Sequence, residues 1–309
     1  MTIPKASKIW HNGRLVPWAK ANVHVLTHSL HYSGAVFEGL RAYPTKQGPS
    51  AIFRMREHID RLFQSAKLYY MPLPYSKAVL AKAVVQTVKA NKLKSCYIRP
   101  IAYRAFGEMG PFPLHNPVHV AIAAWPWGAY LGKATEQGVH CITSSWHRIS
   151  PKQVPTLAKS SGNYANSMLA KIEAHRAGAH EAIMLNDEEF VSEGTGENLF
   201  LVKDGKLITP PVTDNILPGI TRDTLITLAR DVGHSVVQEH VMRDELYSAD
   251  EAFLCGTATE VAPIVEVDGE RIGKGKPGPM TLHLQRKYRE VVHGQHPEYN
   301  RWLTYVGSF

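Results

Sequence analysis

The sequence predicts a mixed α/β (α+β) fold built from two domains. A chain of 309 residues is long for a single core, since domains commonly hold about 100 to 200 residues. Segments rich in β-branched residues alternate with segments whose apolar residues recur at helical spacing. From residue 125 the chain reads WPWGAY, where proline and glycine interrupt bulky aromatic residues. We therefore expect an N-terminal domain over 1–125, an interdomain segment over 126–137 and a C-terminal domain over 138–309.

The first domain is expected to open with β-structure. HNGRLVPW is typical of two short strands around a turn at Asn12 and Gly13. The apolar residues of REHIDRLFQSAKLYY recur at helical spacing until Met71-Pro72 ends the pattern, and 76–89 predicts a second amphipathic helix. SCYIRPIAYR and PVHVAIAAWPW are rich in β-branched and aromatic residues, which favours strands.

The second domain is also expected to mix strands and helices. VHCITSS, EAIMLN, LFLVKDGKLIT and EAFLC have the composition of strands, and the third contains an Asp204-Gly205 hairpin turn. Helical patterns begin near Asn163 and Thr221 and again after Pro279.

Composition argues against several classes of protein. Apolar residues make up 44% and charged residues 20% of the chain, and no apolar run reaches the ~18 to 20 residues that span a bilayer. With no secretory signal visible, the expected location is the cytoplasm. The net charge of +8 is scattered over the chain, which disfavours nucleic acid as a partner. Cys96, Cys141 and Cys255 are far apart, which indicates buried thiols and no disulfide framework.

Lys159 is the first candidate for chemistry. It lies between an apolar approach and the polar run SSGN, just ahead of a helical pattern that places Ala165, Met168, Leu169 and Ile172 on one stripe. A lysine at such a turn can be partly desolvated, which leaves an amine able to form a Schiff base. Taken alone, a lysine in a loop is usually a surface charge.

Two later turns could bind anions. Pro218-Gly219 leads into a helix whose first amides, at Ile220 and Thr221, lack internal partners and suit a phosphate. At 256–259, small residues would expose backbone donors and hydroxyls to a second anionic group. Either turn alone could be a simple helix cap or strand end, but both together with a capped lysine favour a cofactor site.

Glu193 precedes the bend GTGEN. A carboxylate at a strand end could pair with a protonated pyridine nitrogen and strengthen the electron-withdrawing character of a cofactor. The alternative is an exposed loop acid.

Six motifs together resemble one family. TLAKSSGNYANSMLAK, VSEGTGENLF, LPGITRDTL and GTATEVAPI, with HSLHYSGAVFEGLR and CYIRPIAYR upstream, are similar to the branched-chain amino acid aminotransferases, which are fold-type IV pyridoxal-phosphate enzymes. The similarity runs from about residue 8 to about residue 285. It implies two mixed α/β domains with the active site between them, pyridoxal 5'-phosphate as cofactor and a homodimer unit that could assemble into a higher homo-oligomer.

The resemblance implies a role for each matching residue. Lys159 matches the catalytic lysine that forms the Schiff base and carries the proton. Arg61 matches the arginine that clamps the phosphate, and Tyr164 and Glu193 match the partners of the phenolic oxygen and the pyridine nitrogen. The implied cofactor-binding residues are Arg61, Lys159, Tyr164, Glu193, Leu217, Gly219, Ile220, Thr221, Gly256 and Thr257.

The substrate pocket is expected near Tyr97 and Arg99, which are two apart on a strand and so leave the same face. The resemblance implies that Arg99 takes the distal carboxylate of glutamate. It also implies that Tyr32 and Met109 come from the neighbouring subunit. The implied substrate-binding residues are Tyr32, Phe37, Gly39, Tyr97, Arg99, Met109, Trp127, Tyr130, Thr257 and Ala258.

The resulting hypothesis is ping-pong transamination of L-leucine, L-isoleucine and L-valine with 2-oxoglutarate. A D-amino acid aminotransferase, an aminodeoxychorismate lyase or an amine transaminase of the same fold is the alternative, and a basic binding protein without activity is a third reading. His24, His28 and His31 could present three imidazoles, but no acid or cysteine completes a site before Glu38, so no metal is expected. GKGKPG satisfies the dinucleotide-binding pattern but lacks its strand context.

Overall fold

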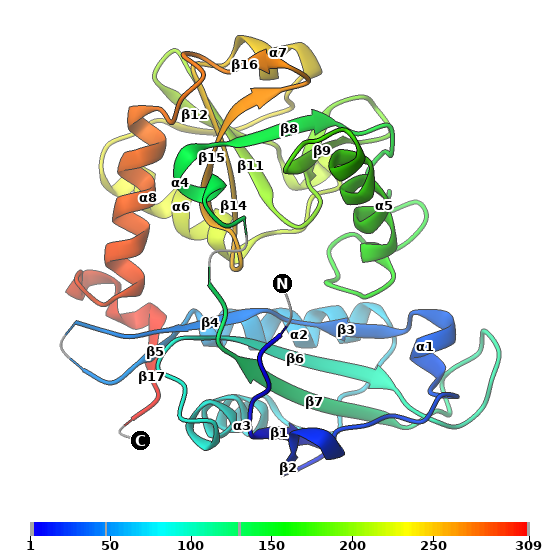
Figure 1. Cartoon of the computed structure of the whole chain (residues 1–309). Coiled ribbons are helices and arrows are strands. Elements are labelled where there is room, and N and C mark those ends of the chain that lie inside the picture. Colours follow the sequence, from blue (N-terminus) through cyan, green and yellow to red (C-terminus); the bar gives the residue numbers. More distant parts are fainter. Residues whose placement is uncertain (1–2, 47, 129–130, 308–309) are drawn as a thin grey trace. The chain divides into compact units, whose positions relative to one another are not determined.

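The computed structural model describes residues 3–46, 48–128 and 131–307, and the chain divides into two compact units (Figure 1). The first unit contains 1–127, 158–162 and 290–309, and the second contains 128–157 and 163–289. Both are built from helices and sheets, which confirms the mixed α/β class.

The first unit is organised around an eight-stranded sheet in the order β17-β5-β4-β6-β7-β1-β2, with β3 paired to β6. Its strands are β1 (Lys8–His11), β2 (Arg14–Pro17), β3 (Ala35–Phe37), β4 (Leu40–Tyr43), β5 (Ala51–Phe53), β6 (Cys96–Arg104), β7 (Val118–Trp125) and β17 (Leu303–Tyr305). Its helices are η1 (Trp18–Lys20), α1 (His28–Tyr32), α2 (Met55–Leu68), α3 (Lys77–Ala90) and η3 (Pro297–Trp302).

The core of this unit lies between the sheet and the helices α2 and α3. Ile98 and Ile122 on the two long central strands pack in one cluster with Leu62 of α2 and Leu80 of α3. Because side chains alternate along a strand, Tyr97 and Arg99 leave β6 on the opposite face. The hairpin predicted at Asn12-Gly13 and both predicted helices are confirmed.

The second unit contains a nine-stranded sheet in the order β10-β9-β8-β15-β14-β11-β12-β13, with β16 paired to β15. Its strands are β8 (Val139–Thr143), β9 (Glu181–Leu185), β10 (Val191–Gly194), β11 (Asn198–Lys203), β12 (Lys206–Thr209), β13 (Val236–Gln238), β14 (Glu251–Gly256), β15 (Glu260–Val267) and β16 (Glu270–Arg271). Its helices are α4 (Ala134–Gln137), α5 (Asn163–Arg176), η2 (Val212–Asp214), α6 (Ile220–Asp231), α7 (Arg243–Ser248) and most of α8 (Pro279–Val292).

Helix α5 begins at Asn163, as the sequence predicts, but it buries a different face from its apolar stripe. Met168, Leu169 and Ile172 are exposed, whereas the small residues Ala170 and Ala174 pack with Ala182 and Met184 of β9. Small side chains allow a helix to approach a sheet closely. The apolar spacing therefore predicted the helix correctly, but the side of the helix that carries the large apolar residues is exposed and the side with the small residues is buried.

The chain first passes from one unit to the other between Trp127 and Gly128, inside the segment expected at 126–137, but this single cut does not separate the two units. Residues 158–162 pack within the first unit, although the sequence places the lysine in the second domain. The C-terminal segment also returns to the first unit, because Leu303 pairs with Phe53 on β5 and the amide of Arg54 donates to the Trp302 carbonyl at 2.7 Å. Both segments join the first unit through backbone hydrogen bonds that the sequence pattern does not reveal.

The three cysteines are free and buried, as expected. Within the part of the chain that the structure describes, every helix falls short of the length or the apolarity that crossing a bilayer requires.

Candidate active site

Lys159 is held in the first unit by its own backbone. Its amide donates to the Ser65 hydroxyl at 3.0 Å, and its carbonyl accepts from the Phe37 amide at 3.0 Å. The side chain is half-buried, and its amine nitrogen lies 5.0 Å from the centroid of the Phe37 ring. The lysine stands outside any helix, four residues before α5 begins, as the sequence predicts.

Phe37 also contacts a second cation. The guanidinium carbon of Arg99 lies 4.7 Å from the Phe37 ring centroid and 5.2 Å from that of Tyr97. Arg99 Nη2 donates to the Tyr97 hydroxyl at 3.1 Å, which confirms that both side chains leave one face of β6. A primary amine and a guanidinium that share one aromatic ring form a surface suited to an anionic molecule with an apolar part.

Gly39 and Trp127 complete this cluster. A Cβ on Gly39 would collide with the Tyr97 hydroxyl, so only glycine allows Tyr97 its position. The Trp127 ring lies 4.6 Å from the Tyr97 ring, nearly perpendicular to it, and Arg41 Nη2 donates to the Trp127 carbonyl at 2.8 Å. The structure thus brings together Phe37, Gly39, Tyr97, Arg99, Trp127 and Lys159.

Arg61 is part of a buried ionic network. Its Nε and Nη2 donate to the two carboxylate oxygens of Glu38 at 2.6 and 3.0 Å, and His58 Nδ1 lies 2.7 Å from Oε2. Burial alone would raise the pKa of Glu38, but the charges of Arg61 and His58 outweigh it and hold that pKa well below its usual range. Burial lowers the pKa of His58, against the attraction of Glu38. Glu38 therefore fixes the plane of the Arg61 guanidinium.

Glu193 is buried in the second unit, not exposed in a loop. Its Oε2 accepts from the Asn198 side-chain amide at 2.9 Å and from the Leu217 backbone amide at 3.1 Å. Its Oε1 lies 3.0 Å from Arg148 Nε, which is not aligned for a hydrogen bond. These contacts hold a carboxylate in place and favour its charged form.

The predicted anion turn at the start of α6 has the required backbone. Gly219 precedes the helix and has no side chain that could cap it. The first backbone amides of α6, including those of Ile220 and Thr221, are therefore not capped by this residue. Thr221 is buried. A Cβ on Gly219 would collide with the Asn198 amide oxygen, and Asn198 Nδ2 donates to the Leu217 carbonyl at 2.9 Å. Asn198 therefore connects the Glu193 carboxylate to the segment that leads into α6.

The second predicted anion turn joins β14 to β15. Gly256 pairs with Glu260, so Thr257, Ala258 and Thr259 form the tip of a hairpin. Thr259 is buried and its hydroxyl donates to Glu197 at 2.8 Å.

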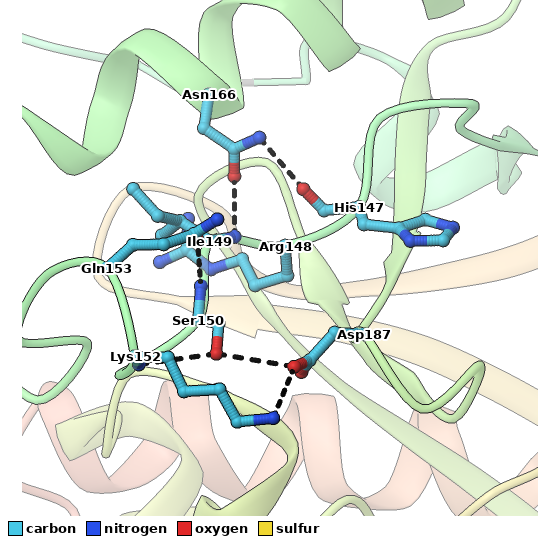
Figure 2. A pocket seen from close by; sticks show the side chains of 8 residues that line it. All are labelled: His147, Arg148, Ile149, Ser150, Lys152, Gln153, Asn166 and Asp187. Carbon is cyan, nitrogen blue, oxygen red and sulfur yellow. Dashed lines mark hydrogen bonds and ion pairs between the residues drawn. The ribbon is translucent and has the colours of Figure 1, made fainter.

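A pocket of about 470 Å³ opens in the second unit near Arg148 (Figure 2). Asn166 fixes one side, because it accepts from the Ile149 amide at 3.0 Å and donates to the His147 carbonyl at 2.9 Å. On the other side, Lys152 Nζ lies 3.2 Å from Asp187. Arg148 lines this pocket, and its Nε also lies 3.0 Å from Glu193 Oε1.

Four further predicted site residues are not among the contacts described above. Tyr164, the second residue of α5, is half-buried. Tyr32 and Met109 are 45% and 46% exposed. Tyr130 lies outside the described residues.

The histidines of the N-terminal segment each contact backbone. His28 Nε2 lies 2.8 Å from the Gly110 carbonyl and His31 Nε2 lies 2.9 Å from the Val25 carbonyl, while His24 Nδ1 accepts from the Leu26 amide. Among the described residues, no cluster of three or more histidine, cysteine, aspartate or glutamate side chains could hold a metal ion.

Sequence reasoning missed the residues that orient the site, namely Glu38, His58, Arg148 and Asn198. The sequence did contain one signal for the buried network of Glu38 and His58. His58 and Arg61 are three apart on α2 and so share a helix face, which indicates a common buried partner.

The chain matches the family model for class IV aminotransferases over residues 35–267. It is 50% identical over 299 residues to a branched-chain-amino-acid aminotransferase of Pseudomonas aeruginosa, covering 96% of this chain and 97% of the relative. It is similar to the crystal structure of the Escherichia coli branched-chain amino acid aminotransferase, with a TM-score of 0.96, 45% identity, and coverage of 98% of this chain and 100% of that one. The T.th. branched-chain amino acid aminotransferase complexed with N-(5'-phosphopyridoxyl)-L-glutamate gives a TM-score of 0.94 at 48% identity, with 98% and 99% covered.

Proposed function

Because the chain belongs to the class IV aminotransferases, and within them to the branched-chain-amino-acid aminotransferases, we propose that it exchanges amino groups between L-leucine, L-isoleucine or L-valine and 2-oxoglutarate. The reaction would proceed in two half-reactions at one site, with L-glutamate and branched-chain 2-oxo acids as products. The observation that carries this proposal is the shared position of Lys159 and Arg99 at the Phe37 ring.

The family uses pyridoxal 5'-phosphate, and the residues present fit that group. A half-buried lysine amine suits its aldehyde, the uncapped amides at Ile220 and Thr221 suit its phosphate, and the buried carboxylate of Glu193 suits its ring nitrogen. When bound, the cofactor withdraws electrons from the substrate α-carbon, which makes the proton on that carbon acidic.

Lys159 would hold the cofactor and then act as the proton carrier at the substrate α-carbon. Its backbone bonds to Ser65 and Phe37 fix the base of the side chain, so only the flexible stem needs to move. The adjacent aromatic ring shields the amine on one side, which limits exchange of the proton with water.

Arg99 would allow one pocket to accept two unlike side chains. The guanidinium stacks against Phe37 and Tyr97 and is bonded to the Tyr97 hydroxyl, so it is preoriented, and within the described ranges it forms no ion pair with a carboxylate. Glutamate would place its distal carboxylate on this cation. Leucine, isoleucine or valine would instead pack against the rings of Phe37, Tyr97 and Trp127.

Other residues would bind the cofactor without taking part in proton transfer. Arg61, fixed by Glu38, would clamp the phosphate together with the α6 amides and the Thr257 hydroxyl. Tyr164 would bond the phenolic oxygen, Leu217 would pack against the ring, and the amides of the Gly256–Glu260 hairpin would also hold the substrate α-carboxylate.

We further propose that two copies pair through the surface around α1. Val25, Leu30 and Phe112 are 70%, 62% and 61% exposed. The segments that carry them are joined by the His28 contact to Gly110 and by the bridge of Thr27 to Phe106. Exposed apolar side chains gathered in one place favour association. Tyr32 and Met109 lie in these segments and would reach the partner's site, as the family resemblance implies.

The test is the visible spectrum of the purified protein before and after L-leucine, with D-alanine added to a parallel sample. Loss of the bound-cofactor band with L-leucine alone supports the proposal. A Lys159→Ala variant should fold normally, yet it should lose that band and at least about a thousandfold of the turnover, as expected for an acid/base and covalent group.

Three other outcomes would contradict the proposal. A response to D-alanine alone indicates a D-amino acid enzyme of the same fold. Transamination retained in Lys159→Ala removes this lysine from the mechanism, and a protein that gains no band with added pyridoxal phosphate is not this enzyme.

A further inference from the structure

Two glutamates that the mechanism does not use are buried together in the second unit. Glu181, on β9, and Glu197, just before β11, are 0% and 4% exposed. Thr195 links their surroundings, because it lies two residues before Glu197 and its hydroxyl donates to Glu181 Oε1 at 2.7 Å. Two carboxylates in a dry interior repel each other unless cations or protons neutralise them.

The nearby cation neutralises only Glu181. Lys171 Nζ, from α5, lies 2.5 Å from Glu181 Oε2 and also donates to the His180 carbonyl at 2.7 Å. In the described part of the chain, no lysine, arginine or histidine forms an ion pair with Glu197. The remaining negative charge would therefore stand alone in a buried place, which favours its protonation.

Glu197 connects two loops that carry proposed binding residues. Its Oε1 accepts from the Thr259 hydroxyl at 2.8 Å, in the hairpin tip that also contains Thr257 and Ala258. Its Oε2 accepts from the Gly196 amide at 2.9 Å, and its carbonyl accepts from the Gly194 amide at 2.8 Å, in the loop that follows Glu193. One side chain thus fastens the second anion turn to the neighbouring loop.

Burial and the neighbouring Glu181 carboxylate favour the neutral form of Glu197. Burial first, and the charge of Glu181 second, raise the pKa of Glu197 to about 8, although Lys171 and the hydrogen bonds from the Thr259 hydroxyl and the Gly196 amide act in the opposite direction. Two thiols lie near enough to Glu197 for its negative charge to raise their pKa, namely Cys141 on β8 and Cys255 on β14. Burial raises the pKa of both thiols above the usual value for cysteine, so they stay neutral in the range where Glu197 titrates.

We propose that Glu197 is a positioning residue that, as a neutral acid, holds the Gly256–Glu260 hairpin in the shape that binds the cofactor phosphate, and that its ionisation loosens this hairpin. The inference rests on the proposed function only in assigning the phosphate to this turn. Ionisation would place a second carboxylate next to Glu181 without a cation, and the hairpin would move to admit water or a counterion. The protein would then bind phosphate-bearing ligands more weakly in alkaline solution.

The experiment compares pyridoxal phosphate with pyridoxal, which lacks the phosphate. Both are titrated into the full chain after removal of its cofactor, at pH 7 and pH 9, for the wild type, Glu197→Gln, Glu197→Ala and Thr259→Val. If binding requires the protonated acid, the wild-type Kd for pyridoxal phosphate rises about tenfold over this range. A group of pKa about 8 is mostly neutral at pH 7, whereas at pH 9 its ionised form exceeds the neutral form about tenfold.

Glu197→Gln carries the neutral shape at every pH, so it should lose most of this alkaline rise. Glu197→Ala and Thr259→Val should weaken pyridoxal phosphate binding at pH 7 by about tenfold, as expected for one lost buried hydrogen bond, and change the Kd of pyridoxal much less. Thermal unfolding of each variant checks that the chain folds.

Two results would overturn the inference. One is an alkaline rise in Glu197→Gln as large as that of the wild type. The other is an equal loss of pyridoxal and pyridoxal phosphate affinity in Glu197→Ala. A wild type that binds no pyridoxal phosphate would refute the proposed function. The inference is then tested in the cofactor-free chain, where Glu197→Gln should be more heat-stable than the wild type at pH 9, and equal stability would overturn it.

Discussion

Replacing Gly219 by alanine should disturb both ends of the proposed cofactor site at once. The backbone of Gly219 has φ −72° and ψ 133°, which any residue adopts easily. The defect is steric, since the new methyl group would occupy the place of the Asn198 side-chain oxygen. Asn198 must rotate, or the first turn of α6 must shift.

The magnitude follows from the hydrogen bonds of Asn198. Its amide nitrogen donates to the Glu193 carboxylate and to the Leu217 carbonyl, both at 2.9 Å. A bond to a charged group contributes about 1.5 to 3 kcal/mol and a neutral one about 0.5 to 1.5 kcal/mol. Loss of both lowers the free energy of unfolding by about 2 to 4 kcal/mol, or roughly 4 to 8 °C in Tm at ~2 °C per kcal/mol. Cofactor affinity should fall at least about tenfold, since a tenfold change needs only ~1.4 kcal/mol.

The assay is differential scanning calorimetry together with a pyridoxal phosphate titration. Gly196→Ala is the matched control, because a Cβ there meets open space in the same unit. It should change Tm by less than about 1 °C. If Gly219→Ala keeps the Tm of the control and binds the cofactor within about twofold of the wild type, then the site tolerates a displaced Asn198. The proposed coupling between the phosphate turn and Glu193 would then be wrong.

Two further predictions concern the first unit. Arg99→Ala should raise the KM for glutamate and 2-oxoglutarate by about tenfold or more in steady-state kinetics, as for one lost charge-assisted contact. The KM for leucine should rise less. An equal rise for both substrates would mean that Arg99 supports the α-carboxylate or the fold. Acidification should destabilise the protein through His58, whose pKa burial lowers from the ordinary 6.5. On acidification, His58 takes up a proton in the unfolded chain before it does so in the folded protein. The stability contributed by neutral His58 is therefore complete above pH 6.5 and is lost as the pH falls towards the folded pKa. Tm should therefore drop between pH 7 and pH 5 more steeply in the wild type than in His58→Gln, and parallel curves would refute this role for His58.

Local signals predicted those elements of the fold that local interactions determine. The hairpin turns at Asn12-Gly13 and Asp204-Gly205 need left-handed backbone at specific positions, and both asparagine and aspartate there have positive φ. Helices α2 and α3 are long enough for their apolar period to be visible. In contrast, β3, β4 and β17 are three or four residues long, too short for any period, and β17 finds its partner about 250 residues earlier in the chain.

The same limit applies to the candidate site. Motifs placed Lys159, Tyr97 and Arg99, because their types and spacing carry chemical information. They could not place Glu38 as the partner of Arg61, since that pair joins a strand end to a helix 23 residues later through side chains alone. A carboxylate in a sequence has no environment until the fold supplies one.

Glu193 and Glu197 show what this limit means for function. Glu193 is on β10 and Glu197 lies four residues later, just before β11. Both are buried, and the sequence VSEGTGENLF does not distinguish their environments. The fold gives Glu193 an arginine and two amide donors, which favour a fixed negative charge suited to a ring nitrogen. Glu197 accepts from one hydroxyl and one amide, which favour its charge, but burial and the negative charge of Glu181 outweigh them and raise its pKa. Exchanging these two environments would leave the motif intact. It would also remove the charge proposed to pair with the cofactor ring and put one beside the hairpin proposed to bind the phosphate. Two glutamates four residues apart are therefore proposed to differ in charge because the fold gives them different partners, Arg148 and Asn198 for Glu193 and Thr259 and Glu181 for Glu197, and the proposed chemistry depends on that difference.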